Sequence, residues 1–225
     1  MYTGPNIVTS GLVLQLDAAN TKSYPGSGTT WTDLSGNNNT GTLTNGPTFS
    51  SADAGSIVFD GTNDFTSLPN NSSLSAGTGD FTFNCWLYPA SWPNNNWSPI
   101  YVTAATNGIW IGQNTTNQFV LRAFGVADRL QYSPVPTVNT WTNVTITRIG
   151  TTATLYYNAA LMTTSTTNQD FIQNTTYIGN DVGSGPGPAY YTGRISCVNF
   201  YKGKGLTATE VLQNYNGTKS RFGIS

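Results

Sequence analysis

The sequence predicts an all-β protein of 225 residues, folded as one jelly-roll β-sandwich with one short C-terminal helix. Short runs of Val, Ile, Thr and aromatic residues recur between clusters of Gly, Asn, Pro and Ser, which is the pattern of a sandwich or jelly roll. Only 8% of the residues are charged but 12% are aromatic, so the chain does not have the composition of a disordered segment. Near residues 207–215, one stretch carries the start and stop signals of a helix.

The predicted strands follow one another from residue 12 to residue 201. The strongest is 81–88, in which Phe81, Phe83, Cys85 and Leu87 share one face and Trp86 lies on the other, so we expect both faces to be covered. The runs that we predict as strands are 12–17, 31–34, 56–60, 81–88, 100–102, 108–112, 119–122, 142–148, 153–157 and 193–201.

The helix prediction depends on a capping box. Thr207 is the expected N-cap, and Glu210 occupies the position whose side chain reaches back to it. Val211 and Tyr215 contribute to a short apolar stripe, and Gly217 fits the C-terminal stop. Two helical turns are too short to be stable alone, so we expect this helix to dock on the sandwich.

The sequence contains neither an internal repeat nor a linker-like stretch, which predicts one domain over 11–217. We expect an N-terminal arm over 1–10 and a C-terminal tail over 218–225, both outside the sandwich. The two cysteines, Cys85 and Cys197, lie in apolar runs, which favours buried free thiols. A disulfide stays open as the alternative if the two strands are neighbours.

The distribution of charge excludes some classes of partner. The net charge is −1 and the nine Lys and Arg residues are scattered, which argues against nucleic acid. No run of about 18 apolar residues is present, so we predict no membrane insertion. The first residues lack the basic and apolar regions of a secretory signal peptide.

Five segments in this order resemble the laminin G-like, pentraxin-type family of concanavalin A-like domains: 55–65, 81–87, 141–145, 193–201 and 206–211. The resemblance covers residues 11–216 and implies a concanavalin A-like jelly roll. A narrower resemblance, over 11–31, 33–37 and 214–222, is to stand-alone versions encoded by tailed phages, notably cyanophages. It implies a virion structural protein that is released by lysis and is present as a homo-oligomer or in many copies beside other capsid or tail proteins.

The carboxylates argue against an enzyme. Retaining glycosidases need two carboxyl groups about 5–5.5 Å apart, but Glu210 is the one glutamate and we place it in a helix cap. No two aspartates are two positions apart; the closest pair is Asp60 and Asp64. The absence of histidine excludes Ser-His-Asp and His-metal chemistry.

One turn contains the residue types that bind calcium. Asp60, Asn63 and Asp64 offer carboxylate and amide oxygens, and the resemblance implies calcium as a cofactor because many laminin G-like relatives bind it. The alternative, which we favour, is that these side chains hydrogen-bond the backbone of their own turn. Asp181 could complete such a site only if the fold brings it close.

Loop aromatics are the candidate binding residues: Trp92 and Trp97 in 89–98, and Tyr190 and Tyr191 beside the Gly/Pro-rich loop 183–188. Each is either anchored in the sandwich, which is the commoner outcome, or displayed to a sugar or protein partner. We therefore predict a capsid decoration or other virion surface protein that docks through 1–10 and 218–225. The alternative is a lectin-like tail or fibre adhesin that binds host polysaccharide through Trp92 and Trp97.

Overall fold

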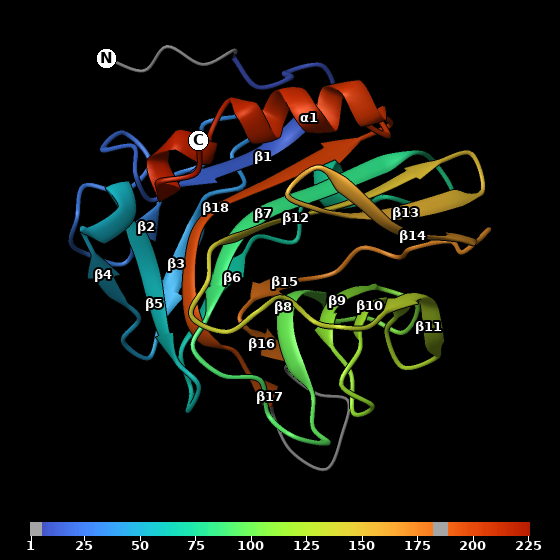
Figure 1. Cartoon of the computed structure of the whole chain (residues 1–225), viewed down its shortest axis with the longest axis horizontal. Coiled ribbons are helices and arrows are strands. Elements are labelled where there is room, and N and C mark those ends of the chain that lie inside the picture. The colour runs from blue at the N-terminus through green and yellow to red at the C-terminus, as the bar shows by residue number, and fades with distance from the viewer. Residues whose placement is uncertain (1–5, 182–188) are drawn as a thin grey trace.

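The structure is a computed structural model that describes residues 6–181 and 189–225. Two antiparallel sheets of eight strands each form a sandwich, with a small two-stranded ribbon at one end (Figure 1). Within the described residues there is one α-helix, α1 (Ala208–Asn216), which lies over the outer face of the first sheet. These features confirm the predicted all-β jelly-roll sandwich with a short C-terminal helix.

Sheet A has the strand order β14-β13-β12-β7-β18-β5-β4. The first part of β18 pairs with β5 and its second part with β1, so β1 also belongs to this sheet. Its strands are β1 (Leu12–Asp17), β4 (Thr48–Ser50), β5 (Ser56–Asp60), β7 (Phe81–Pro89), β12 (Thr142–Ile149), β13 (Thr152–Tyr157), β14 (Ala160–Thr166) and β18 (Thr192–Lys202).

Sheet B has the order β11-β10-β9-β8-β15-β6-β3-β2, and β16 pairs with β17 in the ribbon. Its strands are β2 (Thr30–Trp31), β3 (Gly41–Thr44), β6 (Phe65–Leu68), β8 (Ser98–Thr103), β9 (Ile109–Gln113), β10 (Phe119–Ala123), β11 (Ala127–Tyr132) and β15 (Thr176–Ile178). The ribbon consists of β16 (Asn180–Asp181) and β17 (Ala189–Tyr190). None of the helices in the described part of the chain is long and apolar enough to cross a membrane.

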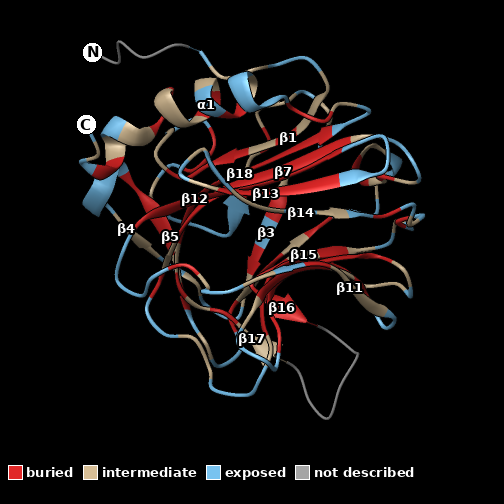
Figure 2. Ribbon diagram, turned by 45° about the vertical axis from the view of Figure 1, so that its right-hand side comes forward, coloured by how far each residue is buried: buried red, intermediate tan, exposed pale blue. Residues whose placement is uncertain are grey.

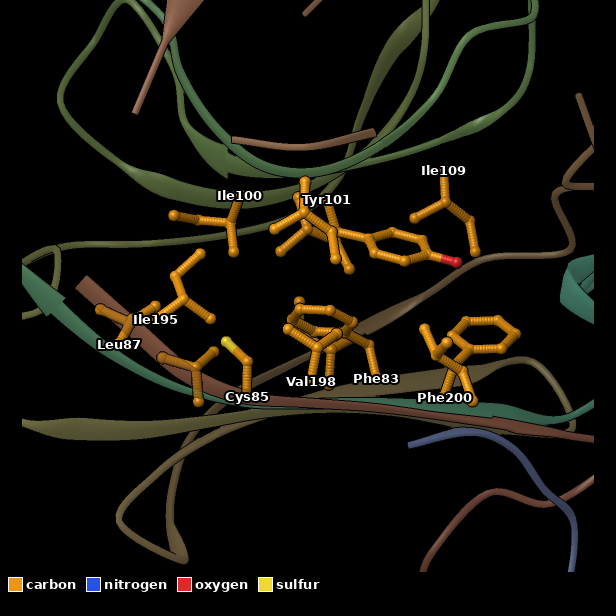
Figure 3. Packing of buried hydrophobic residues seen from close by; sticks show 14 of the residues in the cluster. Phe83, Cys85, Leu87, Ile100, Tyr101, Ile109, Ile195, Val198 and Phe200 are labelled. Atoms are coloured by element: carbon orange, nitrogen blue, oxygen red, sulfur yellow. The ribbon is translucent and has the colours of Figure 1, made fainter. Parts of the chain in front are cut away.

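The core lies between the two sheets. Figure 3 shows Phe83 of β7 and Phe200 of β18 facing Tyr101 of β8. The Tyr101 ring centroid lies 5.2 Å from that of Phe83 and 5.8 Å from that of Phe200. Burying one such side chain stabilises the fold by roughly 1.5–3 kcal/mol. Figure 2 shows the buried residues along the central strands and the exposed ones mainly in the loops.

The outer face of sheet A is covered by the C-terminal segment. The Trp86 ring stacks on Phe222, with ring centroids 4.2 Å apart, and its Nε1 donates to Thr218 Oγ1 at 2.8 Å. A short 3₁₀ helix, η3 (Lys219–Phe222), carries Phe222 onto this face. We expected 218–225 to be a free tail, but residues 218–222 are part of the packed fold. Their side chains cover the Trp86 ring, which would otherwise face solvent.

Part of the expected N-terminal arm is also held against the fold. Val8 N donates to Asn214 Oδ1 at 2.8 Å, Tyr201 Oη donates to Val8 O at 2.9 Å, and Gln213 Nε2 donates to Asn6 O at 2.7 Å. Residues 6–8 thus lie along α1 and β18. A free arm would leave these backbone groups to water, but here side chains of α1 and β18 form hydrogen bonds with them.

The capping box of α1 is confirmed. Glu210 N donates to Thr207 Oγ1 at 3.3 Å, and Thr207 N donates to Glu210 Oε2 at 2.9 Å. Gly217 occupies the C-cap.

The two cysteines are free and buried. Cys85 lies opposite Val198 and Cys197 lies opposite Trp86 on the paired strands β7 and β18. Cys85 packs between the sheets, whereas Cys197 packs with Trp86 on the outer face of sheet A. The thiols therefore point to opposite sides of one sheet, which rules out the disulfide alternative.

The predicted strand 31–34 is shorter in the structure, because Asp33 forms a turn. Its Oδ1 accepts from Gln15 N at 2.8 Å and Ser35 N at 2.9 Å, and its Oδ2 accepts from Asn39 N at 2.9 Å. These bonds hold 33–39 as a turn, so β2 stops at Trp31 and the predicted run 31–34 is wrong beyond it.

One buried cation joins two loops to sheet A. The Arg148 side chain is fully buried at the end of β12. Its Nε donates to Gly79 O at 2.9 Å, Nη1 to Gln169 O at 2.6 Å and Nη2 to Gly77 O at 2.8 Å. Its Cζ lies 5.1 Å from the Phe81 ring centroid and 5.2 Å from that of Phe171.

Candidate functional site

The outer face of sheet B carries an apolar cluster made of Val102, Trp110, Val120 and Phe124. Successive strand residues point to opposite faces, so Ile109 and Ile111 enter the core while Trp110 between them points outward. Three neighbouring strands, β8, β9 and β10, thus place apolar side chains together on a face that does not contact sheet A.

A loop before β8 places Trp97 over this cluster. Gln113 Nε2 donates to Pro93 O at 2.7 Å, and Asn95 N donates to Asn117 Oδ1 at 3.3 Å. These bonds attach the loop to the end of β9 and the turn after it. The Trp97 ring then packs edge-on against Trp110, with centroids 5.1 Å apart and an interplanar angle of 76°.

Arg122 lies over the Trp97 ring, with its Cζ 4.9 Å from the ring centroid. Its Nη1 donates to Asp128 Oδ1 at 2.7 Å, and Asn114 Nδ2 donates to the other oxygen of Asp128 at 2.9 Å. Within the described residues the remaining Arg122 N–H groups have no hydrogen-bond partner. The guanidinium is therefore oriented by Asp128 and keeps donors for a ligand.

A pocket of about 40 Å³ opens between these groups. The Trp110 Nε1 donates to Asp181 Oδ2 at 3.1 Å, which places a carboxylate in the lining of the pocket together with Arg122. The tryptophan–arginine pocket, as we name it, is lined by Trp97, Trp110, Arg122, Phe124, Gly125 and Asp181. It combines an aromatic ring, a partly exposed cation with free donors and a largely buried carboxylate on the outer face of sheet B.

The structure separates the four predicted aromatic residues. Trp97 belongs to the pocket, but Trp92 is anchored, because its Nε1 donates to Pro136 O at 2.7 Å and its ring lies 6.0 Å from that of Tyr191. Tyr191 is fully buried, which excludes it from a surface site, and burial raises the pKa of its hydroxyl well above the usual value. Tyr190 is half-buried in β17. The Gly/Pro-rich loop 183–188 lies outside the described residues.

The predicted calcium turn is satisfied by its own backbone. Asp60 Oδ1 accepts from Thr62 N at 2.7 Å, and Asp64 Oδ2 accepts from Asp60 N at 3.0 Å. The Thr62 N–H lowers the pKa of Asp60, whereas burial raises that of Asp64. Asn63 N also donates to Asp60 Oδ1, at 3.4 Å. This arrangement matches the self-bonded turn that we favoured.

Calcium binding stays a prediction. Across residues 6–181 and 189–225, no group of three or more His, Cys, Asp or Glu side chains is placed to hold a metal ion. Asp181, which could have completed the set, hydrogen-bonds Trp110 in the tryptophan–arginine pocket.

Sequence reasoning missed Trp110 and Arg122, and it considered Asp181 only as a further calcium ligand. Trp110 and Arg122 are direct partners across the β9–β10 ladder, so the sheet register brings them together. The one sequence signal for Trp110 was its position between two core isoleucines, which places it on the outward face.

Comparison with family models gives one match. The model described as the concanavalin A-like lectin/glucanases superfamily, a laminin G type, matches residues 60–212, more than half of the chain. No curated protein matches the sequence at a significant level.

Solved structures share the fold at low sequence identity. The binding domain of Paraclostridial Mosquitocidal Protein 1 is 19% identical with a TM-score of 0.71, and it covers 92% of this chain and 52% of its own. The binding domain of Botulinum neurotoxin DC, solved with rat synaptotagmin II, is 16% identical with a TM-score of 0.73, covering 94% and 52%. Domain 4 of an extracellular arabinanase from Geobacillus stearothermophilus, solved with arabinotriose, is 17% identical with a TM-score of 0.68, covering 92% and 98%. The chain thus spans about half the length of the two toxin chains.

Proposed function

The chain belongs to the concanavalin A-like lectin/glucanases superfamily, and from that premise we propose that it is a non-catalytic recognition module that binds carbohydrate through the tryptophan–arginine pocket. Because one fold hosts many functions, the proposal must rest on the site and not on the fold. The observation that carries it is the Arg122 guanidinium, held over Trp97 with unpaired donors on an exposed face.

The chemistry of the pocket suits a sugar. Hydroxyl oxygens accept from the free N–H groups of Arg122, and hydroxyl hydrogens donate to a carboxylate such as Asp181. The apolar C–H face of a sugar ring packs on an indole such as Trp97. Because the pocket is only about 40 Å³, roughly the space of one water, it would receive one hydroxyl group of a sugar whose ring lies over the outer face of sheet B.

The carboxylates support binding over catalysis. Glu210 Oε1 forms an ion pair with Lys204 at 2.7 Å, and its other oxygen caps α1. Asp60 and Asp64 hydrogen-bond their own turn. These side chains have structural partners, so they lack the freedom that a general acid or a nucleophile needs.

The structural neighbours are compatible with this role. The arabinanase domain was solved with arabinotriose and the botulinum binding domain with a protein receptor fragment. At 16–19% identity they support the fold alone, so the ligand of this chain must be determined directly.

A glycan array followed by titration tests the proposal. We expect wild-type protein to bind at least one oligosaccharide, and Trp97→Ala and Arg122→Gln each to weaken that binding at least tenfold, or about 1.4 kcal/mol. Leu212→Ala, an exposed position on α1, is the matched control and should bind as the wild type does. An array without signal, or equal loss in all three variants, would refute the proposal.

We also propose that the module is displayed in many copies on a virion. The observation that favours display is that Asn6, the first described residue, and Arg221, four residues before the last, line one pocket on the outer face of sheet A. A chain attached there would direct the tryptophan–arginine pocket on sheet B outward. Cryo-electron microscopy of particles tests this: density at capsid lattice positions supports decoration, density at the tail supports an adhesin, and density at neither contradicts both.

A further inference from the structure

A second pocket lies on the other side of the sandwich, between the outer face of sheet A and the terminal segments. Its volume is about 150 Å³, several times that of the tryptophan–arginine pocket. Asn6 and Ile7 close it on one side, and Thr218 and Arg221 on another. We name it the terminal pocket; it shares no lining residue with the first pocket.

The floor of the terminal pocket is a regular array of side chains. Gln15 lies directly opposite Asn199, and Asp17 directly opposite Cys197, on the antiparallel strands β1 and β18. Residues two apart on a strand share a face, so all four side chains point into the pocket. The sheet therefore presents two amides, a carboxylate and a thiol from a rigid surface.

The two amides have unused hydrogen-bonding capacity. Asn199 Nδ2 donates to Asn84 Oδ1 at 3.1 Å, which orients the Asn199 amide, and Asn199 is only 5% exposed. Within the described residues, neither the Asn199 Oδ1 nor the side-chain amide of Gln15 has a hydrogen-bond partner. Neither side chain is among those with a fully buried polar atom that lacks a partner, so these atoms are reachable from the pocket and can bind water or a ligand.

The charges of the pocket cancel. Arg221 Nη1 donates to both Asp17 oxygens, at 2.9 and 2.8 Å. One cation and one anion held together leave no net charge to attract an ionic ligand, and a charged group placed here would have to separate from water without a counter-ion. A neutral ligand avoids this cost.

Size limits the ligand further. Liquid water occupies about 30 Å³ per molecule, so 150 Å³ corresponds to about five waters. Pockets for drug-sized ligands have roughly 300–1,000 Å³. The pocket therefore has room for one small polyhydroxylated ring, but not for several linked sugar or peptide units.

We propose that the terminal pocket binds a neutral monosaccharide unit, with the amides of Gln15 and Asn199 and the carboxylate of Asp17 pairing with its hydroxyl groups. Each hydroxyl is a donor and an acceptor, and the floor offers both. The apolar sides of the ring would lie against Ile7 and the Cys197 sulfur. This site is independent of the carbohydrate site proposed on sheet B.

The test is a titration of ¹⁵N-labelled full-length protein with glucose, galactose, mannose and arabinose, followed by NMR. Glucuronate, similar in size but anionic, is the charged control. The variant is Gln15→Met, which keeps the side-chain length and removes an amide that bonds no described residue; an unchanged melting temperature shows that it folds. Trp97→Ala is the control for the other site.

We expect at least one neutral sugar to shift the backbone amides of residues 15–17 and 197–199 saturably, with a Kd of roughly 0.1–10 mM. Gln15→Met should weaken the binding of this sugar roughly 3–10-fold, the effect of one lost hydrogen bond, and Trp97→Ala should leave the binding unchanged. The proposal is overturned if no neutral sugar saturates, if glucuronate binds as well, or if Gln15→Met binds as the wild type does. Loss in Trp97→Ala would assign the binding to sheet B and would also overturn it.

Discussion

Replacing Arg148 by Met tests how the loops around residues 77–80 and 167–171 are held on the sandwich. Methionine keeps the length and apolar stem of the side chain but removes the guanidinium. Three carbonyl oxygens, those of Gly77, Gly79 and Gln169, then lose their donor.

The expected loss of stability follows from these bonds. A hydrogen bond to a charged group contributes a net of about 1.5–3 kcal/mol, so three give roughly 5–9 kcal/mol before the cost of burying the cation is subtracted. Burial lowers the pKa of Arg148, which reflects that cost, while Asp80 and Asp170 offset part of it. Leaving a buried carbonyl oxygen without a donor costs about 1–3 kcal/mol, so with three of them we expect Arg148→Met to lose about 3–5 kcal/mol after the cost of burying the cation is subtracted.

Urea unfolding at equilibrium, followed by tryptophan fluorescence, measures this loss. With a slope of roughly 2–3 kcal/mol per M, the midpoint should fall by about 1–2.5 M. Arg148→Lys keeps the charge but cannot reach three carbonyls with one ammonium group. Its urea midpoint should therefore lie between those of the wild type and Arg148→Met. A Met variant within about 1 kcal/mol of the wild type would refute the reasoning and show that the loops hold themselves.

Further predictions concern the helix cap, the thiols and the C-terminal segment. Burial acts to raise the pKa of Glu210, but hydrogen bonds from Lys204 and the capping box outweigh it and hold the pKa below its usual value. A lowered folded-state pKa stabilises the fold above the unfolded value of about 4.3 and is lost as pH falls below it. Glu210→Gln should therefore lower stability by about 0.5–1 kcal/mol at pH 7, and urea curves at pH 7 and 3 should show the difference closing; a constant difference would contradict this. Burial raises the pKa of Cys197 to about 12 and that of Cys85 well above normal, so Ellman's reagent should find no thiol in the native protein at pH 8 and two in urea; reaction of the native protein would contradict the packing. Phe222→Ala removes the ring that covers the outer face of sheet A and should cost about 2–4 kcal/mol by urea unfolding, whereas a neutral effect would restore the view of 218–225 as a free tail.

The sequence predicts the central strands well because their two faces alternate. The predicted runs for β7, β12 and β18 match the observed strands within about one residue at each end. The period of two is clearest in β7, whereas β18 has a bulge between Ile195 and Cys197. The capping box locates the start of α1 equally well. Strands β11 and β14 were missed; both lie at the edge of a sheet and carry polar residues where a central strand carries apolar ones. Strands β6 and β15 lie inside sheet B and were missed because they have only four and three residues, too few to show a period.

The candidate site was predictable only in part. Trp97 stands out in the sequence because it lies in a loop, but its partner Arg122 is 25 residues away in sequence and reaches it through the order of β8, β9 and β10. For the two adjacent tyrosines, the sequence interpretation named a residue that does not reach the surface. Neighbouring residues of an extended segment point to opposite sides, so no more than one of Tyr190 and Tyr191 could face a ligand, and Tyr191 enters the core.

The most direct test of the central claim is a crystal structure of the protein with the oligosaccharide that binds best on the array. We expect a sugar ring against Trp97, with hydroxyl oxygens within hydrogen-bond distance of the Arg122 guanidinium. A sugar bound elsewhere on the sandwich, or no bound sugar at millimolar concentration, would contradict it.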